Sequence, residues 1–150
     1  MERVLFFERF GYFLSNFSSF KVCWRGRQWM TAEHAYQSGK FDDETITEEI
    51  RLATSSHDAK RIARLHEGAI RESWADEKLD IMKEIIRAKI EQHEYIREQL
   101  LVTDGAFLVE DSPVDDFWGR GSDWQGSNHL GKIWMELREE LVAQQSGSEN

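Results

Sequence analysis

The sequence predicts an α+β fold that is mostly helical, in which a small N-terminal β-hairpin region packs on a helical bundle. Three observations predict this class. Short β-type runs lie within residues 4–29, helical periodicity starts at Thr31, and one more β-type run follows at residues 107–110. Because the 150 residues show no repeat and no linker, we expect a single compact domain over residues 1–143 and a polar, disordered tail over residues 144–150.

The β-type residues near the N-terminus form the first predicted elements. Residues 4–7 and 20–24 carry the aromatic and β-branched side chains that are typical of short strands. A tight turn over residues 25–27 then leads into a hairpin partner at residues 28–29. The sequence therefore predicts a hairpin that ends just before the first helix.

Capping residues indicate three short helices after the hairpin. Thr31 precedes a helix that we expect to run through residue 41. Residues 45–48, Thr-Ile-Thr-Glu, match a capping box that opens a second helix ending near residue 53. Either Ser55 or Ser56 caps a third helix.

Apolar periodicity predicts two longer helices in the second half of the chain. The first follows Trp74 and closes at Leu100, and its periodic positions are Leu79, Met82, Ile86, Ile90 and His93. The second follows Asn128, which we expect to cap it, and its apolar face is Leu130, Ile133, Leu137 and Leu141. Between them lies a glycine-rich loop at residues 115–127, and loops of this length usually carry function.

The overall charge limits the classes of partner. Acidic residues outnumber basic residues 28 to 19, which gives a net charge of −9. Such a field repels phosphate backbones, so a nucleic-acid substrate needs a local basic cluster. The arginines that could supply this cluster are Arg25, Arg27, Arg61, Arg64 and Arg120. The six Trp, nine Phe and three Tyr indicate a lined cavity as well as a core.

The cysteine, histidine and hydropathy patterns predict that the protein has no disulfide, no bound metal or cofactor and no membrane segment. Cys23 is the single cysteine, and the five histidines show no metal-ligand spacing, so we expect no disulfide, no metal and no cofactor. Charged residues interrupt the apolar residues of the N-terminus and leave no run long enough for a signal peptide or a membrane span. We therefore expect a cytoplasmic protein without membrane contact.

One face of the first predicted helix carries residues suited to catalysis. Glu33, Gln37 and Lys40 fall on this face because a separation of seven residues is nearly two helical turns. A carboxylate and an amine can then serve one pocket. The alternative is a solvated helix face, where such pairs are common and contribute little. The spacing leaves both interpretations open.

Two loop segments carry further candidate binding residues. Residues 115–121 combine two acids, two aromatic rings and two glycines, so that backbone can approach a ligand while a ring stacks on it. The alternative there is a turn with Phe117 and Trp118 in the core. Ser15 and Asn16 lie between apolar residues and suit hydrogen bonding to ribose or phosphate, or else an Asn-containing turn.

Two blocks in this order give the chain a family resemblance. They are Glu-His-Ala-Tyr-Gln at residues 33–37 and Asp-Asp-Phe-Trp-Gly at residues 115–119. Supporting blocks are residues 13–17, Lys40-Phe41, residues 56–64, Trp74, Asn128, Leu130-Gly131 and Met135. Over residues 4–142 the pattern resembles the NADAR (NAD and ADP-ribose) family. The main departure is Ala63, where the family pattern has a small Gly, and it affects helix packing more than chemistry.

The resemblance implies an α+β, mostly helical enzyme that hydrolyses N-glycosidic bonds. The catalytic residues that it implies are Glu33, Lys40, Trp74 and Asp115. The substrate-binding residues that we expect are Ser15, Asn16, Phe17, Tyr36, Trp118, Gly119 and Asn128. Two routes stay open. In one, Glu33 transfers protons, Asp115 serves the ribose and Trp74 stacks on the base; in the other, Lys40 forms a Schiff base with the opened sugar.

The family pattern allows two substrates and one non-catalytic role. The substrates are phosphorylated ribosyl-amine intermediates of riboflavin synthesis, and ADP-ribose linked to the guanine amine in nucleic acid. The net acidity of the chain favours the small molecule. A non-catalytic ADP-ribose-binding module is the third reading, and the presence of Glu33, Lys40 and Asp115 disfavours it.

Overall fold

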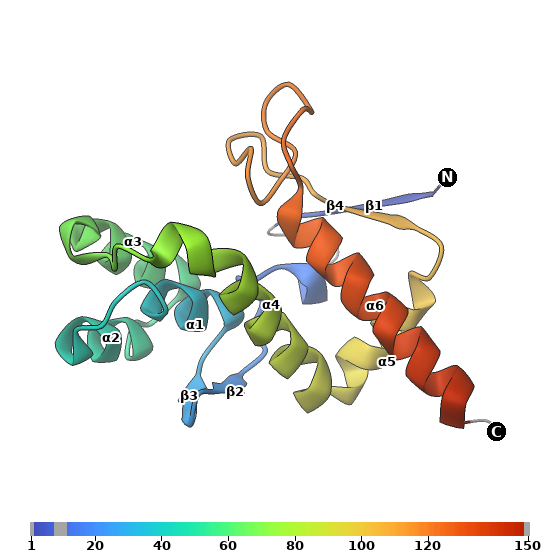
Figure 1. The fold of residues 1–150 in the computed structure, drawn as a ribbon, viewed down its shortest axis with the longest axis horizontal. Helices are drawn as coiled ribbons and strands as arrows, with labels where there is room; N and C mark the ends of the chain where they lie inside the picture. The colour runs from blue at the N-terminus through green and yellow to red at the C-terminus, as the bar shows by residue number, and fades with distance from the viewer. Residues whose placement is uncertain (1, 8–11, 149–150) are drawn as a thin grey trace. The chain divides into compact units, whose positions relative to one another are not determined.

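The structure is a computed structural model that describes residues 2–7 and 12–148. Its described part contains six α-helices, two 3₁₀ turns and two two-stranded sheets (Figure 1). The predicted class, α+β and mostly helical, is confirmed. The chain forms two compact units, a central unit of residues 16–92 and a terminal unit of residues 1–15 and 93–150.

The central unit begins with the predicted hairpin. Strands β2 (Val22–Trp24) and β3 (Arg27–Trp29) pair antiparallel, with Val22 opposite Trp29. The two turn residues, Arg25 and Gly26, have φ values of 50° and 78°. Positive φ at both central positions is the requirement of a type I′ turn, whose twist matches that of the strands. The hairpin packs on helices α1 and α4 of the same unit, as expected.

Four helices complete the central unit: α1 (Ala32–Ser38), α2 (Glu44–Arg51), α3 (Ser56–Leu65) and α4 (Trp74–Gln92). The cap at Thr31 is confirmed, because its side chain accepts from the backbone N–H of His34. Ser55 caps α3 in the same way through the N–H of Asp58. Helix α1 ends at Ser38 and is therefore shorter than predicted.

The cap of α2 differs from the prediction. The carboxylate of Asp43 accepts from the backbone N–H groups of Thr45 and Ile46, at 2.8 and 3.2 Å. Asp43 therefore satisfies two of the free donors at the helix start, and the helix begins one residue before the proposed capping box. The capping-box prediction at Thr45 was wrong because a stronger acceptor precedes it.

The core of the central unit surrounds α1, whose seven residues are all buried. This helix packs against α2, α3 and α4. An apolar cluster between the first helices consists of Phe41, Ile46, Ile50, Ala53, Ala59, Ile62 and Ala63. Ala63 is 2% exposed, so the position that departs from the family pattern is indeed a packing position.

The terminal unit joins the two ends of the chain through a parallel strand pair. Strand β1 (Arg3–Phe6) pairs with β4 (Phe107–Glu110), with Arg3 opposite Phe107. Helices α5 (Glu94–Val102) and α6 (His129–Ser148) belong to this unit, and α6 packs on both α5 and β4. Both sequence-predicted strands exist.

Two helix boundaries in this half of the chain differ from the sequence prediction. The single long helix expected from Trp74 to Leu100 is interrupted at His93, whose backbone is extended (φ −129°, ψ 105°). Helix α6 continues to Ser148, so most of the segment expected as a polar tail is helical. Residues 149–150 of that segment lie outside the described residues. None of the described helices is both long and apolar enough to cross a bilayer.

Candidate functional site

The face of α1 that carries Glu33, Gln37 and Lys40 is not a solvated helix face. Glu33 and Gln37 are 6% and 4% exposed. The Gln37 side-chain amide donates to Glu33 Oε1 at 2.7 Å, and the backbone N–H of Glu33 donates to the carbonyl of Asn16 at 3.0 Å. A buried carboxylate that is held by hydrogen bonds on a rigid helix suits proton transfer at a fixed position.

Lys40 follows the end of α1 and is partly buried. Burial lowers the pKa of its ammonium, the Glu33 carboxylate opposes that shift, and the charges of three further cations add to it. These cations are Lys60, Lys78 and Arg64. Because a lowered pKa enlarges the neutral amine fraction, the shift has the direction that a lysine nucleophile requires.

Aromatic rings connect Lys40 to Trp74 at the start of α4. Lys40 Nζ lies 5.5 Å from the centroid of the Tyr36 ring. The rings of Tyr36 and Trp74 are 5.3 Å apart at an interplanar angle of 58°. Trp74 is 8% exposed, so the described chain already covers most of it. The structure thus brings Glu33, Tyr36, Lys40 and Trp74 together in the central unit.

Two buried amide oxygens beside Glu33 lack a hydrogen-bond donor within the described part of the chain. They are Asn16 Oδ1 and Gln37 Oε1, and the Asn16 side chain is held only through its amino group, 3.4 Å from Met82 Sδ. An unsatisfied buried acceptor costs roughly 1–3 kcal/mol. Two of them next to a buried carboxylate indicate a site that receives donors from a ligand. The sequence places Gln37 on the same helix face as Glu33 but does not predict that it binds substrate.

Buried hydrogen bonds anchor the loop that carries Asn16 and Phe17. Ser56 donates to the Phe17 carbonyl at 3.3 Å and shares a 2.9 Å hydrogen bond with the Thr31 hydroxyl. Thr31 in turn lies 2.7 Å from His34 Nδ1, and His34 Nε2 donates to the Ala53 carbonyl. Burial lowers the pKa of His34, which keeps it neutral in this chain of hydrogen bonds.

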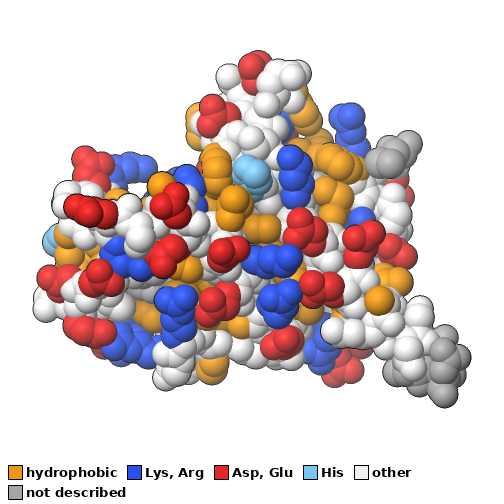
Figure 2. Space-filling model, viewed as in Figure 1, with side chains coloured by type: hydrophobic (Ala, Val, Ile, Leu, Met, Phe, Trp, Pro, Cys, Tyr) orange, Lys and Arg blue, Asp and Glu red, His pale blue; other side chains and the backbone are white. Residues whose placement is uncertain are grey.

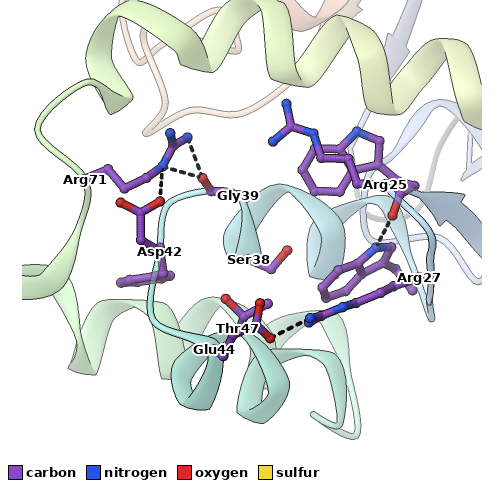
Figure 3. A pocket seen from close by; sticks show the side chains of 11 residues that line it. Arg25, Arg27, Ser38, Gly39, Asp42, Glu44, Thr47 and Arg71 are labelled. Atoms are coloured by element: carbon purple, nitrogen blue, oxygen red, sulfur yellow. Dashed lines mark hydrogen bonds and ion pairs between the residues drawn. The ribbon is translucent and has the colours of Figure 1, made fainter.

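A pocket of about 220 Å³ lies at the C-terminal end of α1, where Ser38 and Gly39 line it, and Figure 3 shows its lining. Arg71 extends into it and donates twice to the carbonyl of Gly39, at 2.8 and 3.2 Å. The backbone N–H of Arg71 donates to the carbonyl of Lys40, and its guanidinium lies 5.9 Å from the centroid of the Trp74 ring. Arg71 therefore fixes the segment before Lys40 and contacts Trp74, a role that sequence reasoning missed because the contacts are non-local.

The terminal unit holds Asp115, the other predicted carboxylate. Its Oδ1 accepts from the backbone N–H groups of Phe117 and Trp118, at 3.0 and 2.8 Å. This is an Asx turn, in which the side chain shapes its own loop. Within the described residues, Oδ2 has no hydrogen-bond partner, so one carboxylate oxygen is not used by the turn.

The aromatic rings of this loop are neither fully exposed for stacking on a ligand nor fully buried in the core. Phe117 and Trp118 are partly exposed, and their rings meet edge to face at 4.8 Å. Phe117 also packs on His129 at 4.5 Å. Gly119 is buried, and a Cβ there would lie 2.9 Å from the Glu110 carbonyl, so close packing alone requires glycine.

Asn128 is committed to the fold of the terminal unit. Its Oδ1 accepts from the N–H of Glu110 and its amino group donates to the carbonyl of Leu108, both at 2.9 Å. The side chain therefore ties the start of α6 to β4 and does not cap the helix as predicted. Ser15 is also buried, and its backbone N–H donates to the carbonyl of Tyr12 at 3.1 Å. Among the described residues, no group of three or more His, Cys, Asp and Glu could hold a metal ion.

Sequence comparison identifies relatives that match most of the chain. Residues 5–142 match the NADAR domain. The chain is 41% identical over 128 residues to N-glycosidase YbiA of Escherichia coli strain K12, covering 85% of this chain and 80% of that protein. It is 40% identical over 130 residues to an N-glycosidase of Nostoc punctiforme, with coverage of 85% and 83%. It is also 39% identical over 129 residues to a riboflavin biosynthesis protein of Vibrio vulnificus, covering 86% of this chain and 35% of that protein.

Structural comparison agrees with the sequence. The NMR structure of the E. coli protein YbiA is similar, with a TM-score of 0.85 and 37% identity over 97% of this chain and 89% of that chain. The resemblance based on the blocks at residues 33–37 and 115–119 is thus confirmed by comparison over nearly the full length. This chain belongs to the NADAR domain family.

Proposed function

We propose that this N-glycosidase hydrolyses the bond between a phosphorylated ribose and an amine nitrogen in a small molecule, with Glu33 as the proton-transfer group. Relatives named as N-glycosidases support the reaction class, and those named as riboflavin biosynthesis proteins support the substrate class. The observation that carries the proposal is the buried Glu33–Gln37 pair, in which Gln37 Oε1 needs a donor, as does the neighbouring Asn16 Oδ1. Ribose hydroxyls and an amine N–H are such donors.

The chemistry needs one proton moved in each direction. The C1–N bond breaks with its electron pair on nitrogen, and Glu33 in its acid form gives that nitrogen a proton. Water then adds to C1 and gives a proton to the Glu33 carboxylate, so the acid form of Glu33 is regenerated. A positioned acid–base group of this kind contributes about 10²–10⁴-fold to the rate. The contribution of Asp115 stays a prediction from the family resemblance.

Lys40 offers a second route through an opened sugar. Its amine adds to C1 of the ring-opened imine, the substrate amine leaves, and water hydrolyses the resulting Schiff base to free lysine and ribose phosphate. The lowered pKa of Lys40 supports this route. Borohydride added during turnover reduces a Schiff base to a stable secondary amine. If mass spectrometry finds the sugar attached to Lys40, the enzyme uses the Schiff-base route. If Lys40 is unmodified while turnover is complete, the route in which Glu33 transfers the proton operates without a Schiff base.

ADP-ribosylated guanine in nucleic acid is the weaker candidate substrate. Most arginines suggested for a strand-binding cluster are occupied by carboxylates: Arg25 by Glu84, Arg27 by Glu44, Arg61 by Asp58 and Arg120 by Asp111. On the face in Figure 2, acidic and basic side chains are interspersed. Neither feature favours a nucleic-acid groove, which needs unpaired basic residues along the strand.

The test compares the two substrates directly. Purified protein is incubated separately with an amino-pyrimidine ribose phosphate and with an oligonucleotide that carries ADP-ribosyl-guanosine, and release of the sugar is followed. We expect kcat/KM for the ribose phosphate to be at least tenfold higher than kcat/KM for the oligonucleotide. Preference for the oligonucleotide would overturn the substrate assignment. Binding without release in both arms would support the non-catalytic module.

A further inference from the structure

Two cations on α3 lack the acidic partners that several arginines of this unit have. Within the described chain, Lys60 and Arg64 form no hydrogen bond and no ion pair through their side chains, although both are exposed. Arg61, between them in sequence, pairs with Asp58 at 2.8 Å. Because Lys60 and Arg64 are four residues apart on a helix, they lie on the same face one turn apart.

This pair lies near Lys40. Helix α3 packs on α1, at whose end Lys40 lies. Lys60 and Arg64 both act electrostatically on Lys40, and Lys78 does so from α4, where it follows Trp74 by one turn. Three cations from two helices of the central unit therefore act on the amine, and Glu33 is the carboxylate that opposes them.

Such a cluster of like charges is unfavourable without an anion. Each cation in the cluster makes it less favourable for the others to be charged. This repulsion contributes to the lowered pKa of Lys40. In a chain with 28 acidic residues, carboxylates are available to neutralise the cluster, yet none pairs with Lys60 or Arg64 in the described part. A ligand phosphate supplies the missing negative charge and up to three acceptor oxygens.

We propose that Lys60 and Arg64 form the subsite that binds the phosphate of the substrate, with Lys78 beside them and Lys40 facing the sugar. The subsite rests on the proposed function for the identity of the ligand, a phosphate monoester of ribose. It does not depend on which of the two chemical routes operates. Arg64 supplies a planar pair of donors and Lys60 a compact charge, a combination suited to one phosphate group.

The first experiment compares Arg64→Gln and Lys60→Gln with the control Arg61→Gln, which removes a charge from the same helix. Charge-assisted hydrogen bonds of this type are worth about tenfold to hundredfold in affinity. We expect each subsite variant to raise KM for the ribose phosphate by about tenfold or more with kcat nearly unchanged, and the control to change neither. Equal effects in all three variants, or none in the subsite variants, would overturn the proposal.

The second experiment uses inorganic phosphate as the probe and needs no turnover. In the wild-type protein, titration with phosphate is followed by NMR or calorimetry, and the same titration is made in the Lys60→Gln/Arg64→Gln double variant. We expect saturable binding that the double variant loses and Arg61→Gln keeps. Phosphate binding of this kind without cleavage of any ribosyl-amine would refute the proposed function and leave the anion site in place. Absence of phosphate binding in an active enzyme would refute the subsite alone.

Discussion

The α1 face and the loop at residues 111–128 both carry carboxylates, amides and aromatic rings, but they use them differently. On α1, the Glu33 carboxylate is bound by a side chain that has an oxygen left over, and the adjacent Asn16 oxygen is also unsatisfied in the described chain. In the loop, Asn128 uses both ends of its amide to hold backbone, and Asp115 uses one carboxylate oxygen in the same way. A polar side chain indicates a ligand only where the fold leaves its hydrogen bonds incomplete.

The largest effect is expected from Glu33→Gln. The substitution keeps the shape of the side chain and can still accept from Gln37, so the melting temperature should stay within experimental error. It removes the exchangeable proton, so the rate should fall by about 10²–10⁴-fold. Single-turnover kinetics and thermal melts measure the two quantities. Glu49→Gln, an exposed substitution in the same unit, is the control, and near-normal turnover in Glu33→Gln would remove this residue from the mechanism.

The next effect is a pH dependence of stability that belongs to the central unit. Lys89 is fully buried, hydrogen-bonded to Ser18, and burial lowers its pKa to about 7. Between that value and about 10.4, the unfolded state binds more protons than the folded state, so stability rises with pH by up to about 1.4 kcal/mol per unit. Below pH 7 this contribution is constant.

Urea unfolding of the wild-type protein at pH 7, 8 and 9 measures this rise. In Lys89→Met, which keeps the length of the side chain and removes the charge, we expect the free energy of unfolding to lose most of its dependence on pH in this range. A slope as steep as that of the wild-type protein would show that Lys89 is not its source. The lowered pKa of His34 acts in a separate window, where stability falls as the pH drops below about 6.5.

A smaller effect is expected in the loop. Asn128→Ala leaves the N–H of Glu110 and the carbonyl of Leu108 without their partner, which should cost roughly 1–3 kcal/mol of stability. The rate per folded molecule should remain normal, because the side chain serves the fold. Gln125→Ala, at an exposed position of the same loop, should change neither. A rate loss with unchanged stability would restore Asn128 as a substrate-binding residue.

Local signals in the sequence predicted the parts of the fold that depend on neighbouring residues. The cap at Thr31, the cap at Ser55 and the turn at Gly26 each need only a few adjacent positions. The face shared by Glu33 and Gln37 followed from helical periodicity in the same way. These predictions succeeded because the determining interactions lie within one helical turn or one hairpin.

Contacts between residues far apart in the sequence could not be predicted from local patterns. The pairing of β1 with β4 joins Arg3 to Phe107, and no local pattern indicates which strands meet. The same holds for Arg71, whose donors reach Gly39 across the unit, and for Asn128, whose amide looked like a helix cap. The break at His93 was missed because apolar periodicity continues across it.

The smallest effect concerns Trp74, whose predicted role is to stack on the base. Trp74→Phe keeps an aromatic ring against Tyr36 and Arg71, so most packing survives and the stability loss should be modest. Base–aromatic stacking contributes roughly 1–3 kcal/mol, and the smaller ring of Phe should retain part of it, so we expect about a tenfold fall in the single-turnover rate. Trp29→Phe is the matched control, because Trp29 is buried in the same unit, 2% exposed. It should lose comparable stability and no activity. A normal rate in Trp74→Phe would make Trp74 a packing residue like Trp29, and the contrast between the α1 face and the loop would then rest on Glu33 and Lys40.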